Sequence, residues 1–542
     1  MSKPTSTDGA QPPGIAMRVV STLGTLAVLP LLLPSAAAQP FVEPGVEVLT
    51  TLFEENPLDS FGFVAEALGD LDGDLRPDYI IGAPGFPGGA FSGKVYVYSG
   101  ASGELLNAIE GNPGDGLGFS VVGLGDVNGD GVPDYATGGP FADGVQAFGR
   151  LLIVSGATHE ILIDLNGVPG SVFAYDINLA GDLNGDGVDD VIVGAIGGGS
   201  GGEGEVAIVS GADGAILWQV QGEVSGDNFG SGVSGLGADI SGDGIPDQVV
   251  GALAGGDSNT GLAYLLSGAD GSTLFELEGL ETAGSLGWFF AHRAGDVNAD
   301  GVVDAYVGDF SDSALGGLDG RAYVFSGADG TRLQVYDAEF ANDGFGIGRT
   351  VGDIDGDGHS DLFLAAYTHS VGAVVQGGKG YLYSGRDQSL IRSMTGSVSG
   401  DQLGFDALPV GDLDADGFAE LMLTGVGVVH VVRGTDPSPA ARVASVCDLL
   451  AGFPDEAYLE PAAPRKERLC ALLTQVRGLV DAQRYLLANA RLRNRVLPRV
   501  DGVVGEDLAQ DWLLDPVLQG IALPWVEGLI TLTQSLAEDN LP

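Results

Sequence analysis

Seven copies of a nine-residue segment carry the side chains of this chain that could bind a metal. In each copy, oxygen-bearing side chains occupy the first, third, fifth and ninth positions. The first positions of successive copies are 56 to 59 residues apart. The candidate ligands are Asp70, Asp72, Asp74 and Asp78; Asp126, Asn128, Asp130 and Asp134; Asp182, Asn184, Asp186 and Asp190; Asp239, Ser241, Asp243 and Asp247; Asp296, Asn298, Asp300 and Asp304; Asp353, Asp355, Asp357 and Asp361; and Asp412, Asp414, Asp416 and Glu420.

This spacing is typical of a calcium loop. It places four oxygen side chains on one side of a tight turn, and the main-chain carbonyl of position seven can add a fifth ligand. Hard oxygen donors in a flexible loop suit Ca²⁺. We expect up to seven calcium ions, bound more weakly in the first loop, where Leu75 replaces the glycine of position six, and in the fourth, where Ser241 is neutral.

Two other interpretations of the loops are open. EF-hand and dockerin-like loops share the pattern, but they adjoin helices, whereas strand-like sequences flank these copies. Asp, Asn and Gly also form turns without any metal. Four acidic-type positions kept in register through seven copies would, however, repel one another without a cation.

Calcium bound in these loops is expected to be structural. With a Kd of about 10⁻⁴ to 10⁻³ M and about 1 mM calcium, binding at each loop would stabilise the folded state by about 0.4 to 1.4 kcal/mol.

Each loop stands in a longer repeat that must position it. A Phe-Gly or a variant precedes the loop, as at Phe61-Gly62 and Gly118-Phe119, and an apolar run such as residues 79–84 follows. Next come an alternating strand that ends in Ser-Gly, as at residues 94–100, and a period-two strand, as at residues 104–109. Four short strands bounded by turn residues are thus expected in each repeat.

Seven four-stranded units predict an all-β fold, a seven-bladed β-propeller over residues 41–434. One such sheet cannot bury both of its faces alone, and radial stacking of seven sheets solves that problem. A fourth-strand pattern precedes the first loop at residues 46–53 and is missing after Gly434. We therefore expect residues 46–53 to complete the last blade and close the ring.

The repeat resembles the FG-GAP repeats of the integrin alpha-subunit propeller. The Phe-Gly, the loop and the following Gly-Ala-Pro match at residues 61–62, 70–78 and 82–84, and the likeness covers about residues 41–434. The resemblance implies a calcium-carrying propeller used in extracellular binding. Integrin propellers carry such loops on only some blades, whereas all seven repeats carry one here. Because no leg domains or transmembrane segment follow, we expect a propeller module and not an integrin subunit.

The two ends of the chain have other compositions. Residues 1–38 are typical of a cleaved export signal, with Arg18, an apolar run and a small-residue site before Gln39. An uncleaved anchor is the alternative. Residues 435–440 are expected to be a linker, and residues 441–542 a small α-helical domain, in which Cys447 and Cys470 can pair in an oxidising compartment. Its basic cluster is either a solvated face or a docking site for an acidic surface; it comprises Arg484, Arg491, Arg493, Arg495 and Arg499.

Charge excludes several classes of protein. With 74 Asp and Glu against 23 Lys and Arg, the chain has a formal charge of −51 and would repel nucleic acids and anionic membranes. A hydrophobic content of 44% nevertheless indicates a folded protein. After the export signal, no segment offers 18 uninterrupted apolar residues, so no membrane span is expected in the mature chain.

These features predict a secreted or cell-surface protein that binds a protein or glycan ligand without catalysis. The enzyme alternative is an extracellular hydrolase or lyase built on a propeller. It would need carboxylates or histidines outside the loops that converge on the central channel, and the sequence pattern shows no such group. A structural envelope protein is the third alternative.

Overall fold

The structure is a computed structural model that describes residues 39–539, except 44, 143–146, 257–259, 281–283, 455–457, 459–461, 498–499 and 501–515. The predicted export signal, residues 1–38, lies outside the described residues. Pro40–Pro542 form one compact unit. Within the described part of this unit, no helix is both long and apolar enough to cross a membrane.

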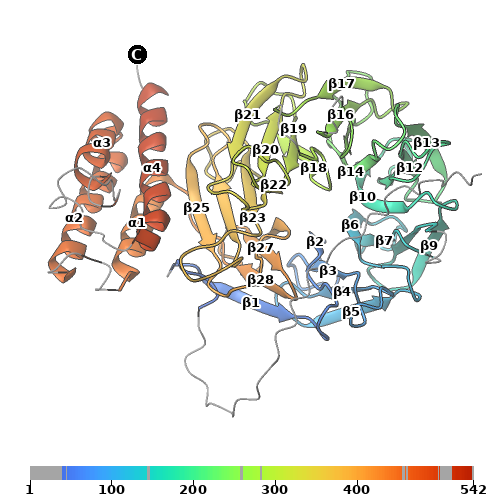
Figure 1. Ribbon diagram of the computed structural model, residues 1–542, viewed down its shortest axis with the longest axis horizontal. Helices are drawn as coiled ribbons and strands as arrows, with labels where there is room; N and C mark the ends of the chain where they lie inside the picture. Colours follow the sequence, from blue (N-terminus) through green and yellow to red (C-terminus); the bar gives the residue numbers. More distant parts are fainter. Residues whose placement is uncertain are drawn as a thin grey trace, which may run out of the picture. The chain divides into compact units, whose positions relative to one another are not determined.

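Seven four-stranded antiparallel sheets are arranged around a central axis (Figure 1). The first strands are β2 (Val64–Ala67), β6 (Ser120–Gly125), β10 (Phe173–Gly181), β14 (Phe229–Gly235), β18 (Ala291–Gly295), β22 (Phe345–Gly352) and β26 (Ala407–Gly411). The second strands are β3 (Tyr79–Ala83), β7 (Asp134–Gly139), β11 (Asp190–Ala195), β15 (Gln248–Ala252), β19 (Asp304–Asp309), β23 (Asp361–Ala366) and β27 (Glu420–Gly425).

The outer two strands complete each blade. The third strands are β4 (Lys94–Tyr98), β8 (Arg150–Val154), β12 (Glu205–Val209), β16 (Leu262–Leu266), β20 (Arg321–Phe325), β24 (Lys379–Tyr383) and β28 (Val428–Val432). The fourth strands are β5 (Leu105–Glu110), β9 (Ile161–Asn166), β13 (Ile216–Gln221), β17 (Thr273–Leu277), β21 (Arg332–Asp337), β25 (Leu390–Thr395) and, in the seventh blade, β1 (Val48–Phe53). The expected all-β seven-bladed propeller is confirmed.

The seventh blade is built from both ends of the propeller sequence. β1 pairs antiparallel with β28, in a register that sets Val48 opposite Val432 and Phe53 opposite Val428. The first strands of neighbouring blades contact one another all the way round the ring, so they line the centre. β1 therefore covers the edge of β28 and gives the seventh blade the fourth strand that the other blades have.

Period-two side-chain alternation stacks the blades. In β4, Val95 and Val97 join a buried cluster with residues of the second blade, whereas Tyr96 joins a cluster with residues of the seventh. Successive side chains of a strand point to opposite faces, so each sheet can be apolar on both. This explains why the second strands, such as β3, are buried along their whole length.

Backbone bridges join each of the first six blades to the next, and they correct the expected Phe-Gly register of the second blade. Gly93 bridges in parallel to Leu117, as Gly149 does to Phe173. Gly118 adopts a φ of +84° and donates its N–H to the Gly138 carbonyl, as Gly62 does with a φ of +85° to Gly82. The Phe-Gly equivalent is thus Leu117-Gly118, and not Gly118-Phe119.

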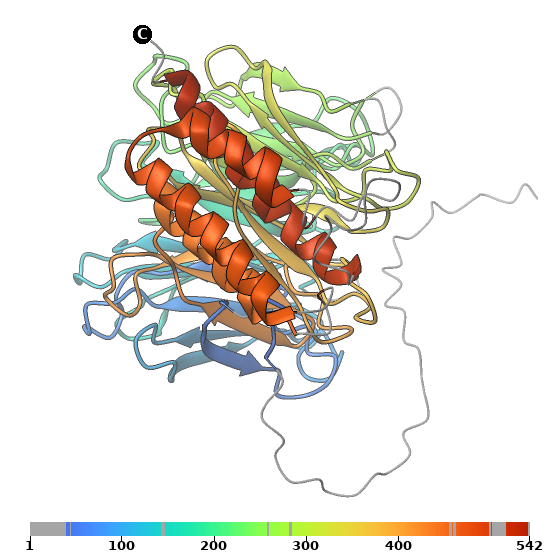
Figure 2. The same ribbon diagram turned by 90° about the vertical axis from the view of Figure 1, so that its left-hand side faces the viewer.

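A group of helices packs beside the sixth blade (Figure 2). It comprises α1 (Pro439–Gly452), α2 (Ala462–Asp481), α3 (Tyr485–Arg491), the π-helical turn η2 (Leu492–Val496) and α4 (Pro516–Asp539). α1 begins inside the predicted linker, because Ser438 caps its first turn and a proline is tolerated there. A disulfide joins Cys447 of α1 to Cys470 of α2.

Buried polar contacts fix these helices on β25. The Arg442 guanidinium of α1 donates to the Ser389 hydroxyl at 2.9 Å and to the Leu390 carbonyl at 2.8 Å. The Trp525 indole N–H of α4 donates to the Ser393 hydroxyl at 2.7 Å. Apolar side chains of both parts form one continuous core, so the helices are an integral part of this unit.

Candidate metal loops and central channel

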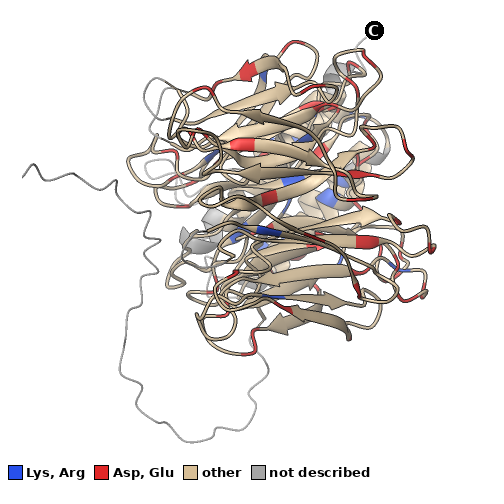
Figure 3. Cartoon of the chain, turned by 90° about the vertical axis from the view of Figure 1, so that its right-hand side faces the viewer, with Lys and Arg blue, Asp and Glu red and all other residues tan. Residues whose placement is uncertain are grey.

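The seven acidic loops all connect the first strand of a blade to its second strand. The loop of residues 70–78, for example, follows β2 and leads directly into β3. Acidic residues are prominent in the loops of the propeller (Figure 3). All seven loops therefore occupy equivalent places, as the repeat predicted.

Main-chain N–H groups orient the carboxylates within each loop. In the second loop, Asp126 accepts hydrogen bonds from Gly129 at 2.7 Å, Asp130 at 3.0 Å and Gly131 at 2.8 Å. Asp130 in turn accepts one from Val132 at 2.9 Å. Such bonds fix the orientation of the carboxylate groups within the loop.

The first loop keeps this geometry although it lacks the glycine of position six. Leu75 adopts a φ of +70° and still donates its N–H to Asp70 at 2.8 Å. A left-handed conformation costs a residue with a side chain about 1–2 kcal/mol. The sequence change therefore introduces local strain but leaves the arrangement of the carboxylates intact.

Position nine anchors the loop to the rest of its blade. Asp78 is fully buried and accepts an N–H from Leu71 at 2.7 Å and another from Gly100, beyond the third strand, at 2.9 Å. Burial raises the pKa of Asp78 to about 6. In the sixth loop, burial and then repulsion by Asp355 raise the pKa of Asp361 to about 8. A bound cation would offset this unfavourable negative charge.

Acidic triplets form in four of the loops, where the ligand oxygens of the three residues lie within 4.8 Å of one another. The triplets are Asp70, Asp72 and Asp78; Asp239, Asp243 and Asp247; Asp353, Asp355 and Asp357; and Asp412, Asp414 and Glu420. The second, third and fifth loops carry Asn at position three, and their described residues form no such triplet. Oxygen-only donor sets of this kind fit a hard divalent cation.

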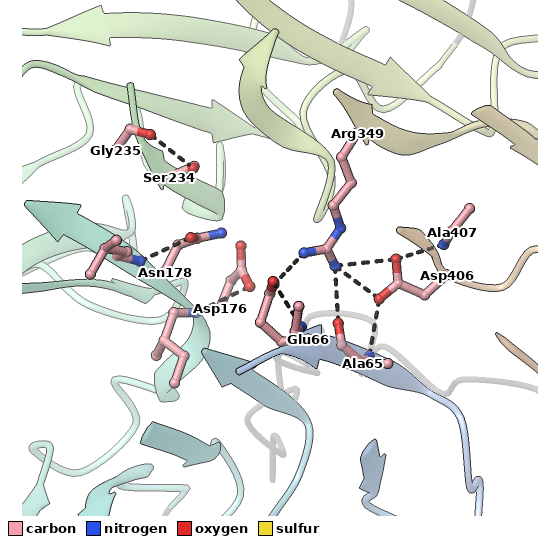
Figure 4. Close-up of polar contacts among 12 residues, drawn as sticks. Ala65, Glu66, Asp176, Asn178, Ser234, Gly235, Arg349, Asp406 and Ala407 are labelled. Atoms are coloured by element: carbon pink, nitrogen blue, oxygen red, sulfur yellow. Dashed lines mark hydrogen bonds and ion pairs between the residues drawn. The ribbon is translucent and has the colours of Figure 1, made fainter. Parts of the chain in front are cut away.

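Charged groups converge at the centre of the ring, which the first strands surround and which is called the channel below, and this corrects the expectation from the sequence. Arg349 of β22 directs its guanidinium at Asp406, next to β26, with Nη2 2.9 Å from Oδ2 and 3.2 Å from Oδ1 (Figure 4). The same guanidinium pairs with Glu66 of β2 and donates to the Ala65 carbonyl at 3.3 Å. Three blades are thus joined by one side chain.

Two further ionisable groups lie on the first strands β10 and β18, which β14 separates. Asp176 of β10 accepts N–H groups from Val233 at 2.8 Å and Ile177 at 3.1 Å, and burial raises the pKa of its carboxyl to about 7. His292 of β18 is buried, and burial together with the charge of Arg349 holds the pKa of its imidazole well below the usual value. The channel therefore has a polar section with mixed charge.

A signal for this group was present in the repeat. Glu66, Asn178, His292 and Arg349 each stand four residues before the first Asp of their loops. Asp176 and Asp406 each stand six residues before theirs. Because side chains of a strand alternate, these two positions of the first strand share one face. Aligning the repeats and comparing only those positions would have found the cluster.

Aromatic side chains form a second channel feature. Each blade has a Phe-Gly pair or a pair equivalent to it. The residue that directly follows this pair is aromatic in five blades. Ring centroids are 4.8 Å apart between Phe63 and Phe119, 5.2 Å between Phe119 and Tyr175, and 5.5 Å between Phe63 and Phe405. The Trp288 indole donates to the Tyr175 hydroxyl at 2.9 Å. Rings from five blades thus contact one another in a continuous cluster.

The fold and its loops define the class: a seven-bladed β-propeller with acidic loops between the first and second strands. No family model matches the chain. Integrin alpha subunits match it in part. Integrin alpha-7 of Homo sapiens is 33% identical over 154 residues, which is 26% of this chain and 13% of the relative. Integrin alpha pat-2 of Caenorhabditis elegans is 29% identical over 233 residues, 37% of this chain and 18% of the relative.

A third relative matches at a comparable identity. Integrin alpha-PS2 of Drosophila melanogaster is 30% identical over 219 residues, 36% of this chain and 15% of the relative. The matched stretches thus span less than a fifth of the length of these relatives. Together with the seven blades, the matches confirm the resemblance to the integrin alpha-subunit propeller.

Proposed function

We propose that this protein is a calcium-stabilised propeller that acts outside the cell as a noncatalytic binding or adhesion module for a protein or glycan ligand. Its similarity to integrin alpha subunits supports a role in adhesion or binding. The observation that carries the proposal is the oriented set of carboxylates repeated at the same place in every blade. A platform held by metal ions suits recognition through surface loops.

The role assigned to calcium is structural. The residues that would hold it are the oxygen ligands of positions one, three, five and nine of each loop. The ion would supply positive charge between carboxylates that burial and mutual repulsion otherwise destabilise. Because position nine is tied to the third strand, a bound ion would fix the loop relative to the whole blade.

Calorimetric titration of the full chain with calcium tests the proposal. We expect several ions per chain, and a lower melting temperature in excess chelator. Asp243→Asn removes one carboxylate of the acidic triplet in the fourth loop and should remove or weaken one site. Asp213→Asn is the matched control, because Asp213 lies in an exposed turn between the third and fourth strands. Equal stoichiometry and equal affinity in the two variants would contradict the assignment of the loops.

Ligand binding is tested on arrays of extracellular proteins and polysaccharides, with calcium and with chelator. We expect retention of at least one array component in calcium and its loss in chelator. Binding that is indifferent to chelator would separate recognition from the metal loops. No retention on either array would count against the binding module.

A second candidate function, an extracellular hydrolase or lyase, draws on the carboxylates in the channel. Two of them, Glu66 and Asp406, are already paired with Arg349, and Asp176 accepts two main-chain N–H groups. This bonding favours a structural network over a pair of free acid and base groups. Release of reducing sugar ends from polysaccharides by the wild type, abolished in Asp176→Asn, would support the enzyme instead.

A further inference from the structure

The seventh loop differs from the other six by the residue that faces it from the third strand. In six blades, the third strand is followed by a Ser-Gly pair. The serines are Ser99, Ser155, Ser210, Ser267, Ser326 and Ser384. In the seventh blade the pair is Arg433-Gly434. The place is equivalent, because Gly434 donates its N–H to position nine of its loop, Glu420, as Gly100 does to Asp78.

The serine hydroxyl lies beside the carboxylate of position five. Ser267 Oγ is 3.2 Å from Asp243 Oδ2, and Ser155 Oγ is 3.4 Å from Asp130 Oδ2. A hydroxyl is neutral and small, so it leaves the charge of the carboxylates uncompensated. A bound cation is therefore still needed to neutralise the negative charge of these loops.

In the seventh loop, Arg433 supplies a positive charge to the carboxylates. Its Nη1 is 2.6 Å from Asp414 Oδ2 and 3.5 Å from Asp416 Oδ2, the third and fifth positions of the loop. Asp414 also belongs to the acidic triplet of this loop. A guanidinium stays protonated at any pH at which the protein is folded, so it is a permanent cation. A divalent ion bound here would have to displace it or be repelled by it.

The same side chain also holds the strand that closes the ring. Arg433 Nε is 3.1 Å from Glu47 Oε2, and the Arg433 N–H donates to the Glu47 carbonyl at 2.9 Å. Glu47 immediately precedes β1, the strand that the N-terminal part of the propeller contributes to the seventh blade. Arg433 thus joins the loop, the third strand and the closing strand.

We propose that Arg433 takes the place of the metal in the seventh loop. The chain then binds calcium at no more than six loops, and the blade that closes the ring is held without calcium. This inference rests on the proposed calcium binding of the other loops. It revises the expectation of up to seven ions. Two other arginines act on the sixth loop: Arg442 lies 3.9 Å from Asp355, and the charge of Arg386 acts on Asp357. That loop nevertheless retains its serine, Ser384.

Calorimetric calcium titration of three variants of the full chain tests this inference. Arg433→Ser, which restores the residue of the other blades, should bind one ion more than the wild type. Arg433→Lys keeps the positive charge and should match the wild type. Ser267→Arg transfers the guanidinium to the fourth blade and should bind one ion fewer. Equal stoichiometry in the wild type, Arg433→Ser and Ser267→Arg would overturn the inference.

The outcomes separate this inference from the proposed function. Calcium binding by the wild type with no gain in Arg433→Ser overturns the role of Arg433 alone. No calcium binding by the wild type or by any variant overturns both proposals. If Arg433→Ser does not fold, the loss of one ion in Ser267→Arg still tests whether a guanidinium at this place excludes the metal.

Hydrogen exchange gives a second readout. On addition of chelator to the wild type, we expect amide protection to fall in the first and second strands of the first six blades. Protection of β1 and β26–β28 should stay within twofold of its value in calcium. In Arg433→Ser, the seventh blade should become as sensitive to chelator as the others. Loss of protection in the seventh blade of the wild type together with the rest would contradict the proposal.

Discussion

Arg349 and Asp406 stand 57 residues apart, one blade from each other, and meet in the channel with Nη2 2.9 Å from Oδ2. The pair is largely buried, and Glu66 shares the same guanidinium. Removing one partner of a buried ion pair leaves an uncompensated charge, which costs about 3–5 kcal/mol. We expect Arg349→Met to lose about that much stability in chemical denaturation with calcium present.

The matched control for this variant is Arg332→Met, because Arg332 is exposed on β21. Its contacts are a hydrogen bond to the Glu278 carbonyl at 3.4 Å and the Tyr323 ring at 6.0 Å. Exposed contacts of this kind contribute about 1 kcal/mol or less, so this change should be nearly neutral. A loss in Arg349→Met no larger than that in Arg332→Met would show that the channel cluster does not hold the blades together.

The stability of the propeller should fall as pH rises through the titration of Asp176. The pKa of this carboxyl is about 7 in the folded protein against an ordinary value of 3.8, and burial is the main cause. The folded state therefore holds this proton more tightly, so the contribution is most favourable below about pH 4 and is lost between pH 4 and 7. Three pKa units correspond to about 4 kcal/mol.

Asp176→Asn should remove this part of the pH dependence, because the amide cannot ionise. The measurement is the free energy of unfolding from pH 4.5 to 8 at saturating calcium, for the wild type and the variant. We expect the variant to gain stability relative to the wild type as pH rises. Parallel pH profiles would contradict the raised pKa of Asp176.

The fold could be predicted from the sequence because its defining signal is repeated seven times. Loops at a nearly constant spacing fix the number of blades, and a fourth-strand pattern before the first loop indicates how the ring closes. The contacts in the channel are not repeated from blade to blade. Arg349, Asp406 and Glu66 each come from a different blade, and they meet only once the ring has closed.

Local details are also missing from the pattern. The sequence pattern places Phe119 in the Phe-Gly pair, but the residue at that place is Leu117, because the defining feature is the positive φ of Gly118 and not the aromatic ring. The pattern does not mark Arg433 as the counterpart of six serines, because the seventh third strand lacks the Ser-Gly of the others. A substitution within a repeat carries information only after the repeats are aligned.

The glycines that precede the third strands should be intolerant of any side chain. Gly149 has a φ of +75°, and a Cβ there would lie 1.9 Å from the Phe173 carbonyl oxygen of the next blade. Gly149→Ala should therefore cost about 1–2 kcal/mol for the left-handed backbone and a further 1–3 kcal/mol for overpacking. Thermal and chemical denaturation measure this loss.

Gly170 provides the control for Gly149. Its φ is +82°, but a Cβ there would have nothing within 4 Å. Gly170→Ala should show only the backbone cost of about 1–2 kcal/mol. Equal losses in the two alanine variants would mean that neighbouring blades can move apart enough to admit a methyl group.

The disulfide should stabilise the helices and not the propeller. Cys447 and Cys470 are 23 residues apart and join α1 to α2. In the chain-entropy account, closing a loop of that length stabilises the folded state by about 3 kcal/mol. In a variant with both cysteines changed to serine, α1 and α2 should lose hydrogen-exchange protection, while the strands of the first five blades keep theirs.

Wild-type protein in reductant should behave as the double variant does, since both lack the same cross-link. Unchanged protection of α1 and α2 would mean that packing on β25, through contacts such as that of Arg442 with Leu390, already determines their stability.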